Sequence, residues 1–146
     1  MKVRLLTLLV AGLVLAACGT VSLATASKSW AKQSQFYSNL PTLTKDVRNT
    51  ATQLHNAHAT ANALHTVCGV LLMDSEQFNS SLPTPDNQAT TLLSKAFSDF
   101  GAGANKCYGA KNDPAARASA LSWLSRGMAE LSEGTARINV ATGAAP

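Results

Sequence analysis

The stretch Ser80-Ser81-Leu82-Pro83-Thr84-Pro85-Asp86 divides two long segments of helical periodicity. Two prolines separated by one residue cannot continue a helix, because proline lacks an amide hydrogen and its ring clashes with the preceding turn. Thr84 suits the N-cap of a new helix, Pro85 its first position and Asp86 the positive end of its dipole. We therefore expect a turn at residues 81–85, a helix that ends near residue 80, and another over residues 85–109.

Upstream of this turn, apolar and small residues recur at alternating spacings of three and four, which indicates one face of a helix. The stripe consists of Leu40, Leu43, Val47, Thr50, Leu54, Ala57, Ala61, Leu64, Cys68 and Leu71. Proline is tolerated in the first turn of a helix but not in its interior. The pattern therefore predicts one long helix over residues 41–80, with a short helix before Pro41 or a kink there.

Two further stripes follow the turn. The first consists of Ala89, Leu93, Ala96, Phe100, Gly103 and Cys107. Asp113 and Pro114 then provide the N-cap and the first position of a last helix. Its stripe consists of Arg117, Leu121, Leu124, Met128, Leu131, Thr135 and Ile138, with Arg117 at the end, where its charge can reach water. Because no strand-like alternation competes, the sequence predicts an all-α fold, a three- or four-helix up-down bundle.

The N-terminal segment has the three-part layout of a secretory signal peptide. Lys2 and Arg4 precede an apolar run over residues 5–15, and small residues then lead to a cysteine. The sequence Leu15-Ala16-Ala17-Cys18 resembles the lipobox of bacterial lipoproteins. This resemblance implies that residues 1–17 are removed and that Cys18 carries a diacylglycerol and a further acyl group such as palmitate. The alternative is an ordinary signal peptide; a membrane-spanning helix needs roughly 18 apolar residues, more than this run contains.

The lipobox resemblance also implies a location, the extracytoplasmic face of a bacterial cell membrane. Two or more acyl chains are sufficient for stable attachment there. Small polar residues over 18–27 predict a lipidated tether. A helical domain over residues 28–140 and a loose tail over residues 141–146 complete the expected organisation.

Cys68 and Cys107 remain as a pair once Cys18 is assigned to the lipid. Paired cysteines outside the cytoplasm are commonly oxidised, so we expect a disulfide between them; the alternative is two separate buried thiols. One difficulty arises, because straight antiparallel helices joined by a tight turn would offset these cysteines by about 13 Å along the bundle. Either a helix bends, near Gly69 or Gly101, or the connection is longer.

The composition argues against a nucleic-acid partner. The chain has 12 basic and 8 acidic residues, and 10 basic residues remain against 8 once residues 1–17 are removed. No basic cluster interleaved with aromatic residues occurs in the sequence. Charged residues make up 14% of the chain, against roughly 25% in typical globular proteins. The surface is therefore expected to be polar but weakly charged.

The chain as a whole resembles a group of small exported actinobacterial lipoproteins. The likeness rests on the lipobox, the helical domain, one cysteine pair and the Leu-Pro-Thr-Pro-Asp turn at residues 82–86 between the cysteines. The later cysteine lies in Gly103-Ala104-Asn105-Lys106-Cys107. The resemblance covers most of the mature chain and implies fold and location, but no activity.

Several polar side chains could support chemistry, yet each has a simpler interpretation. His55, His58 and His65 fall on the predicted long helix, with the last two on one face, but no carboxylate stands at a ligand-like spacing. We interpret them as residues at the edge of the core. The groups interpreted as solvated helix faces or ordinary hydroxyls are Asp74, Glu76, Glu130, Glu133, Ser122, Ser125 and Ser132. We therefore predict no catalytic residue, no metal site and no cofactor.

The expected function is non-enzymatic. The chain is interpreted as a lipid-anchored structural or interaction module whose partners are the membrane and another envelope protein or lipid. The alternative is a carrier of a small ligand or lipid, with a pocket between the helices. Trp30, Phe36 and Tyr37 lie near the predicted tether, where they either contact the membrane interface or, as we favour, cap the end of the core.

Overall fold

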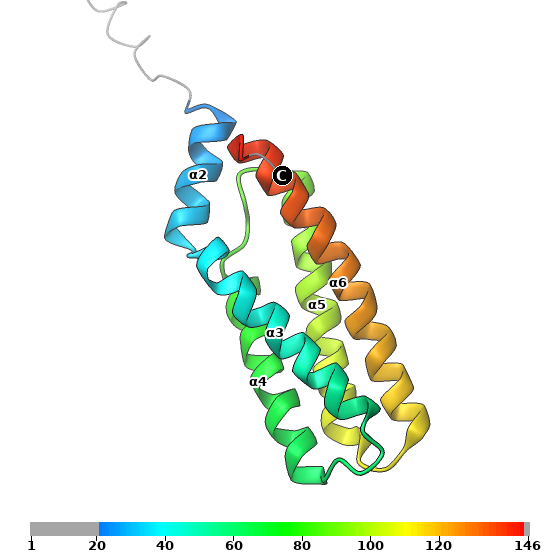
Figure 1. Cartoon of the computed structure of the whole chain (residues 1–146). Coiled ribbons are helices and arrows are strands. Elements are labelled where there is room, and N and C mark those ends of the chain that lie inside the picture. The colour runs from blue at the N-terminus through cyan, green and yellow to red at the C-terminus, as the bar shows by residue number, and fades with distance from the viewer. Residues whose placement is uncertain (1–20, 145–146) are drawn as a thin grey trace, which may run out of the picture.

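The computed structural model describes residues 21–144, and this part of the chain contains five helices and no strand. The helices are α2 (Leu23–Gln33), α3 (Phe36–His55), α4 (Ala61–Ser80), α5 (Asn87–Ala110) and α6 (Pro114–Thr142). The long helices α3 to α6 run antiparallel to their neighbours in the chain, and the short α2 lies at one end, beside the last turns of α6 (Figure 1). The all-α prediction is confirmed, with five helices in place of three or four. The predicted signal peptide and Cys18 lie outside the described residues.

Helix α2 begins within the segment for which the sequence predicts a tether, residues 18–27. Ser22 caps this helix, since its side-chain oxygen accepts a hydrogen bond from the Thr25 amide at 3.2 Å. Ser27 is fully buried and lies one turn before the buried Ala31, so α2 packs on the bundle along this face. The sequence predicts a tether here because small hydroxylated residues suggest a flexible segment, whereas in the structure their small size allows close packing.

The break between the first two helices falls before Pro41, at Ser34 and Gln35. Gln35 adopts a left-handed conformation with φ of 52°, which ends one helix and redirects the chain into the next. Pro41 lies inside α3 as its sixth residue. Proline is ordinarily excluded from a helix interior, yet α3 continues through this residue to His55.

The prediction of a single helix over residues 41–80 is wrong, because the chain leaves the helix at residues 56–60. Helix α3 ends at His55, and α4 begins after Thr60, whose hydroxyl oxygen accepts a hydrogen bond from the Ala63 amide at 3.1 Å. The spacing of the apolar stripe continues through the loop, so periodicity alone does not reveal the break.

Arg117 stabilises this loop, and its burial corrects another prediction. The sequence places its charge in water, but the residue is only 8% exposed. Its guanidinium donates to the carbonyl oxygens of Asn56 at 2.6 Å and Lys111 at 2.8 Å, with longer bonds to those of Leu54 and Ala59. Carbonyl groups at a helix C-terminus and in a loop lack helical partners and favour a cation. One side chain therefore joins both loops at this end of the bundle.

The disulfide joins α4 to α5, as the sequence predicts. Cys68 and Cys107 are both buried, and their Cα atoms lie 5.9 Å apart. The connection between the two helices accounts for the expected offset, because residues 81–86 run past the end of α4 in an extended path before α5 begins (Figure 1). An extended chain covers about 3.3 Å per residue, so this segment is long enough to span the offset.

Helix α6 extends beyond residue 140, the predicted end of the domain. It runs to Thr142, and both Ala141 and Thr142 are buried. The Thr142 hydroxyl donates to the Ile138 carbonyl at 2.9 Å. Gly143 then ends the helix with φ of 66°, a conformation that glycine adopts without strain. The predicted loose tail is therefore helical in its first two residues.

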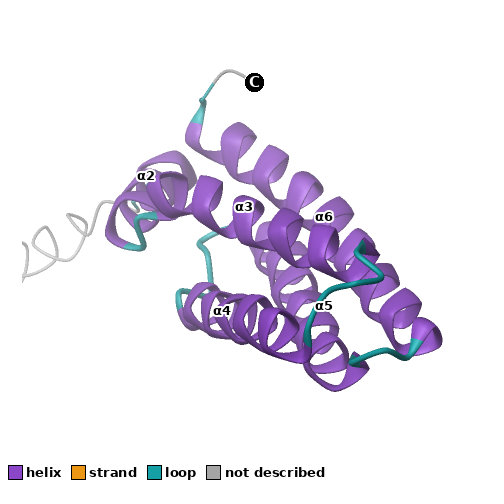
Figure 2. Cartoon of the chain, turned by 60° about the horizontal axis from the view of Figure 1, so that its bottom comes forward, coloured by secondary structure: helices purple, strands orange, loops and turns teal. Residues whose placement is uncertain are grey.

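The pair α5–α6 is the most extensively packed in the bundle, and Figure 2 shows the two helices side by side. Small buried residues recur every seven positions on both helices. They are Ala89, Ala96, Gly103 and Ala110 on α5, and Ala120, Gly127, Gly134 and Ala141 on α6. Each of the three glycines faces a large side chain of the other helix: Gly103 faces Leu124, Gly127 faces Phe100, and Gly134 faces Leu93. This alternation of small and large residues lets the two backbones approach closely.

Substitution of Gly127 by alanine tests this packing. A Cβ atom there would lie 2.7 Å from two ring atoms of Phe100 and 3.0 Å from the Ala96 carbonyl oxygen. We expect Gly127→Ala to lower the free energy of unfolding by about 2 kcal/mol, the cost typical of overpacking, in a urea titration followed by circular dichroism. Gly69→Ala is the matched control, because nothing lies within 4 Å of its Cβ position; it should stabilise the protein by about 1 kcal/mol through helix propensity. Equal effects of the two variants would contradict the account.

Candidate functional site

Both ends of the described chain meet the α4–α5 connection at one end of the bundle (Figure 1). We call this the N-terminal end and define it as residues 21–38, 82–91 and 135–144. The opposite end carries the loops at residues 56–60 and 111–113. The N-terminal end is therefore built from segments that lie far apart in the sequence.

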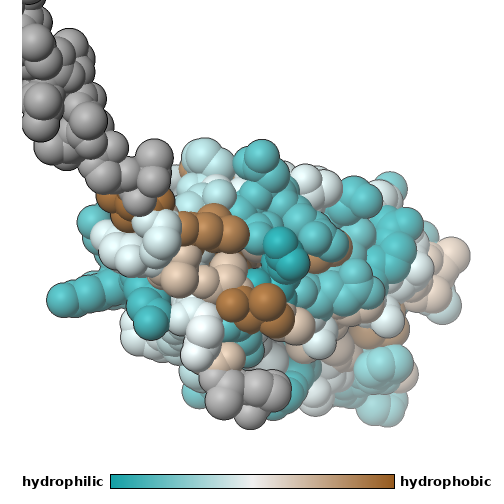
Figure 3. Space-filling view, turned by 90° about the horizontal axis from the view of Figure 1, so that it is seen from above, coloured by the Kyte–Doolittle hydropathy of each residue, from teal (hydrophilic) through white to brown (hydrophobic). Residues whose placement is uncertain are grey.

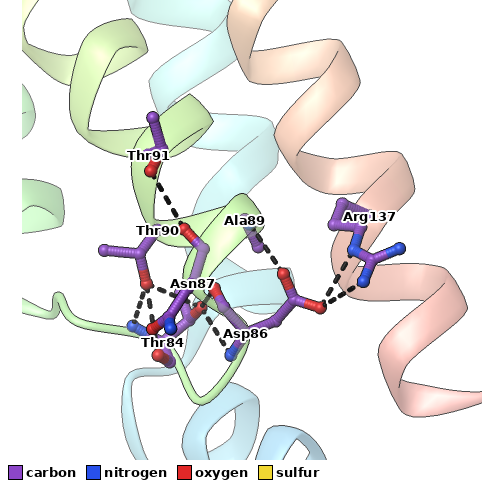
Figure 4. A network of polar contacts seen from close by, with 7 residues as sticks. All are labelled: Thr84, Asp86, Asn87, Ala89, Thr90, Thr91 and Arg137. Carbon is purple, nitrogen blue, oxygen red and sulfur yellow. Dashed lines mark hydrogen bonds and ion pairs between the residues drawn. The ribbon is translucent and has the colours of Figure 1, made fainter.

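A polar network fixes the connection against α6 at the N-terminal end (Figure 4). Asp86, and not the predicted Thr84, is the N-cap of α5, because its carboxylate accepts a hydrogen bond from the Ala89 amide at 2.9 Å. The same carboxylate accepts a hydrogen bond from Arg137 Nε of α6 at 2.9 Å and forms an ion pair with Arg137 Nη2 at 2.8 Å. These bonds to Arg137 hold the pKa of the Asp86 carboxyl below its usual value. Thr84 donates to the Asp86 carbonyl at 2.7 Å and so fixes the turn before the helix.

The aromatic residues near α2 cap the core, which agrees with the interpretation favoured from the sequence. Phe36 is buried and packs against Trp30 and Phe78, with ring centroids 5.3 and 6.3 Å away. The Trp30 indole donates to the Ser81 carbonyl at 2.8 Å, which ties α2 to the end of α4. Tyr37 differs from the other two, since it is 42% exposed.

A cavity of about 500 Å³ opens between α2, the start of α3 and the end of α6. We call it the end pocket. Its walls include Ala31, Thr142 and Gly143, and its charged groups are Lys28 and Lys32 of α2. The spacing of four places these two lysines on one helix face, a signal that sequence reasoning did not use.

The N-terminal end carries the whole positive excess of the described residues. It contains the basic residues Lys28, Lys32 and Arg137 and the acidic residue Asp86, whereas the rest of the described chain holds seven basic and seven acidic residues. Because Arg137 is paired with Asp86, the two lysines account for the excess. The positive charge is therefore concentrated at the end pocket.

Exposed apolar side chains also gather at this end. Seven large apolar residues are exposed in the described chain, and four of them belong to the N-terminal end: Val21, Leu23, Tyr37 and Val140. Val21 and Val140 are each more than two-thirds exposed, at 70% and 72%. Figure 3 looks down on this end and shows brown apolar atoms beside the grey N-terminal residues and across the middle of the face, among polar side chains.

A groove runs along the seam between α3 and α6, which pack together less extensively than the other neighbouring pairs of long helices. It consists of three cavities of about 410, 350 and 310 Å³. The first two share Met128 in their linings, and the last two share Leu121 and His55, so neighbouring cavities border the same side chains. Leu40 and Ala51 of α3 line the groove from the other side. We call this feature the α3–α6 groove.

Tyr37 stands between the end pocket and the α3–α6 groove. Its hydroxyl donates to Asn139 Oδ1 at 2.8 Å and lies 3.5 Å from the Thr142 hydroxyl. Tyr37 and Thr142 line the end pocket, and Asn139 lines the first cavity of the groove. A side-chain hydrogen bond therefore joins a wall residue of the end pocket to a wall residue of the groove.

His58 and His65 do not share a helix face, because the predicted long helix is interrupted between them. His55 is the last residue of α3, His58 lies in the loop, and His65 lies on α4. The His65 ring stacks on Tyr108, with centroids 4.1 Å apart. Within residues 21–144, no group of three or more histidine, cysteine or acidic side chains is placed to hold a metal ion.

Of the acidic candidates, Glu76 and Glu133 are exposed, as the sequence predicts, whereas Glu130 and Asp74 are partly buried. Burial, together with a hydrogen bond and the charge of Asp46 on α3, raises the pKa of the Asp74 carboxyl to about 6. Sequence reasoning missed this carboxyl pair because it assigned both residues to one continuous helix, on which they could not meet.

None of the helices in the described part is both long enough and apolar enough to cross a membrane. Comparisons of the chain with protein-family models, with curated proteins and with solved structures find no match.

The carboxyl pair of Asp46 and Asp74 predicts a specific pH dependence of the free energy of unfolding. Because the pKa of Asp74 is raised from 3.8 to about 6 in the folded protein, the native state binds the proton more tightly than the unfolded state. This contribution to the free energy of unfolding therefore falls as the pH rises from about 4 to 6. Asp74→Asn should be neutral near pH 4 and stabilising by about 1 kcal/mol at pH 7, after allowance for solvent screening. Urea titrations at both pH values measure this, with the exposed Glu76→Gln as control; destabilisation by Asp74→Asn at pH 7 would rule the interpretation out.

Proposed function

We propose that this protein is a lipid-anchored, non-enzymatic interaction module on the extracytoplasmic face of a bacterial membrane, and that its N-terminal end rests on the bilayer. The observation that carries the proposal is the coincidence, at this one end, of the positive excess of residues 21–144 and most of the large apolar residues exposed within them. Each basic residue near an anionic bilayer contributes about 1 kcal/mol, and apolar and aromatic side chains partition into the interface.

The lipobox fits this orientation. Cys18 stands three residues before Val21, the first residue that the structure describes. A chain of that length reaches at most about 11 Å. An acyl group on Cys18 would therefore hold the N-terminal end, and not the opposite end, against the membrane surface.

A protein partner would meet a different surface. Val70 and Met73 on α4 are 43% and 71% exposed, and their spacing of three places them on one helix face. This face lies outside the N-terminal end, so it stays accessible when that end is on the membrane. We propose it as the contact for another envelope protein.

The anchor is tested by Cys18→Ser in the native host. We expect the unaltered protein in the membrane fraction, labelled by an alkyne analogue of palmitate and released by detergent but not by alkaline carbonate. Cys18→Ser should lose the label and either remain unprocessed or become soluble. The double variant Cys68→Ser/Cys107→Ser is the control, since it removes the other two thiols and should keep the label. Labelling of Cys18→Ser at the unaltered level would overturn the proposal.

A further inference from the structure

We infer that the end pocket and the α3–α6 groove form one binding site for an anionic lipid with a single acyl chain and a phosphate-type headgroup. In this arrangement the headgroup lies beside Lys28 and Lys32, and the acyl chain lies between α3 and α6. The inference rests on the proposed function, because the membrane beneath the N-terminal end is the source of the lipid.

The groove has the length and lining that an acyl chain needs. Residues 40–55 of α3 border it, and at 1.5 Å per residue they span about 22 Å. One leaflet supplies about half of a hydrocarbon core that is about 30 Å thick, so a single chain fits within this length. The cavities follow one another in single file along one helix pair, which favours one chain over two. Leu40, Ala51, Leu121, Met128 and Leu131 give the groove an apolar lining.

The end pocket fits the headgroup. The pocket has a volume of about 500 Å³. A bare carboxylate would leave most of this space empty, since it is only a few times the size of a water molecule, which occupies about 30 Å³. Ammonium groups one turn apart on α2 can donate charge-assisted hydrogen bonds to phosphate oxygens. Ser38 and Gln35 add polar groups to the rim. A glycerophosphate headgroup therefore fits the pocket better than a fatty-acid carboxylate does.

Tyr37 provides the passage between the two parts. It is 42% exposed, and its hydroxyl bond to Asn139 joins side chains that lie at the surface or close to it. Rotation of this phenol away from Asn139 would connect the end pocket to the groove without a change in any backbone. The junction of headgroup and acyl chain would then lie where the Tyr37–Asn139 bond is now.

The far end of the groove offers a competing position for the headgroup. His55 lies there and the exposed Arg48 lines the middle cavity beside it, whereas Arg117 is engaged with backbone carbonyls. We place the headgroup at the N-terminal end because the two lysines account for the net positive charge of the described residues and because the membrane lies on that side in the proposed orientation. Arg48→Gln therefore serves as the variant that distinguishes the two orientations.

The test uses the full-length lipidated protein in phosphatidylcholine vesicles. The probe is lysophosphatidylglycerol that carries a photoactivatable diazirine in its acyl chain, and cross-linked peptides are mapped by mass spectrometry. We expect cross-links to residues 40–55 of α3 and 121–135 of α6. Lys28→Gln/Lys32→Gln should reduce the yield about tenfold, since two exposed charge contacts are lost. Lys95→Gln/Lys106→Gln removes the same charge on α5, away from the site, and should leave the yield unchanged. Arg48→Gln, in the wall of the groove, should lower the yield less than Lys28→Gln/Lys32→Gln does.

Three further measurements complete the test. Ser132 is exposed and lines the first cavity, so Ser132→Trp should block cross-linking while circular dichroism shows an unaltered melting temperature. Lysophosphatidylcholine and palmitate with the same diazirine should each cross-link several-fold less, because one lacks the net charge and the other the headgroup.

Equal yields for all three probes, cross-links mapped to α4 or α5, or a loss confined to Arg48→Gln would overturn the inference. Sedimentation with the vesicles tests the proposed function and cross-linking in the groove tests the lipid site, so the two can fail independently. Cross-linking in the groove by a protein that does not sediment with vesicles would refute only the anchor, and sedimentation without groove cross-links would refute only the lipid site.

Discussion

The close approach of α5 and α6 is the constraint on which the rest of the structure depends. Small residues at every seventh position of both helices receive large side chains of the partner, as Gly127 receives Phe100 and Gly134 receives Leu93. Such an interlock allows one register and one separation, because a Cβ atom at these glycines would collide with its neighbour. The disulfide between Cys68 and Cys107 then attaches α4 to this pair. Helices α2 and α3 then pack on the surfaces that this three-helix layer leaves uncovered.

Helix α3 covers the layer incompletely, and this produces the candidate site. It precedes α4 in the chain and leaves a seam against α6 that is filled by side chains only in part, as the row of cavities shows. Helix α2 lies at the end of the bundle and adds two lysines beside the last turn of α6. Apolar groove and charged pocket therefore meet at the end of the molecule where the N-terminal segment leaves. This layout supports the proposed binding of an amphiphilic lipid, and the proposed lipid anchor indicates which end of the molecule faces the membrane.

Sequence reasoning predicted the elements that local chemistry determines and missed those that depend on distant contacts. The Asp113-Pro114 start of α6 and the proline-rich connection before α5 were both predictable, because caps and prolines act on their immediate neighbours. The break at residues 56–60 was not predictable, because the apolar spacing runs through it. The guanidinium that stabilises this loop belongs to Arg117, which stands 61 residues after its partner Asn56 in the sequence. The end pocket was not predictable either. Its walls come from three helices whose arrangement depends on the left-handed Gln35 and on the buried Ser27.

Hydrogen–deuterium exchange of the lipidated protein tests the central claim, that the N-terminal end rests on the membrane, most directly. Peptides would be compared between protein on vesicles of phosphatidylglycerol and phosphatidylcholine and the same protein released from its anchor. The account predicts added protection on vesicles within residues 21–40 and 135–144, and none in the loops at residues 56–60 and 111–113. Protection of those loops, or equal protection of both ends, would contradict it.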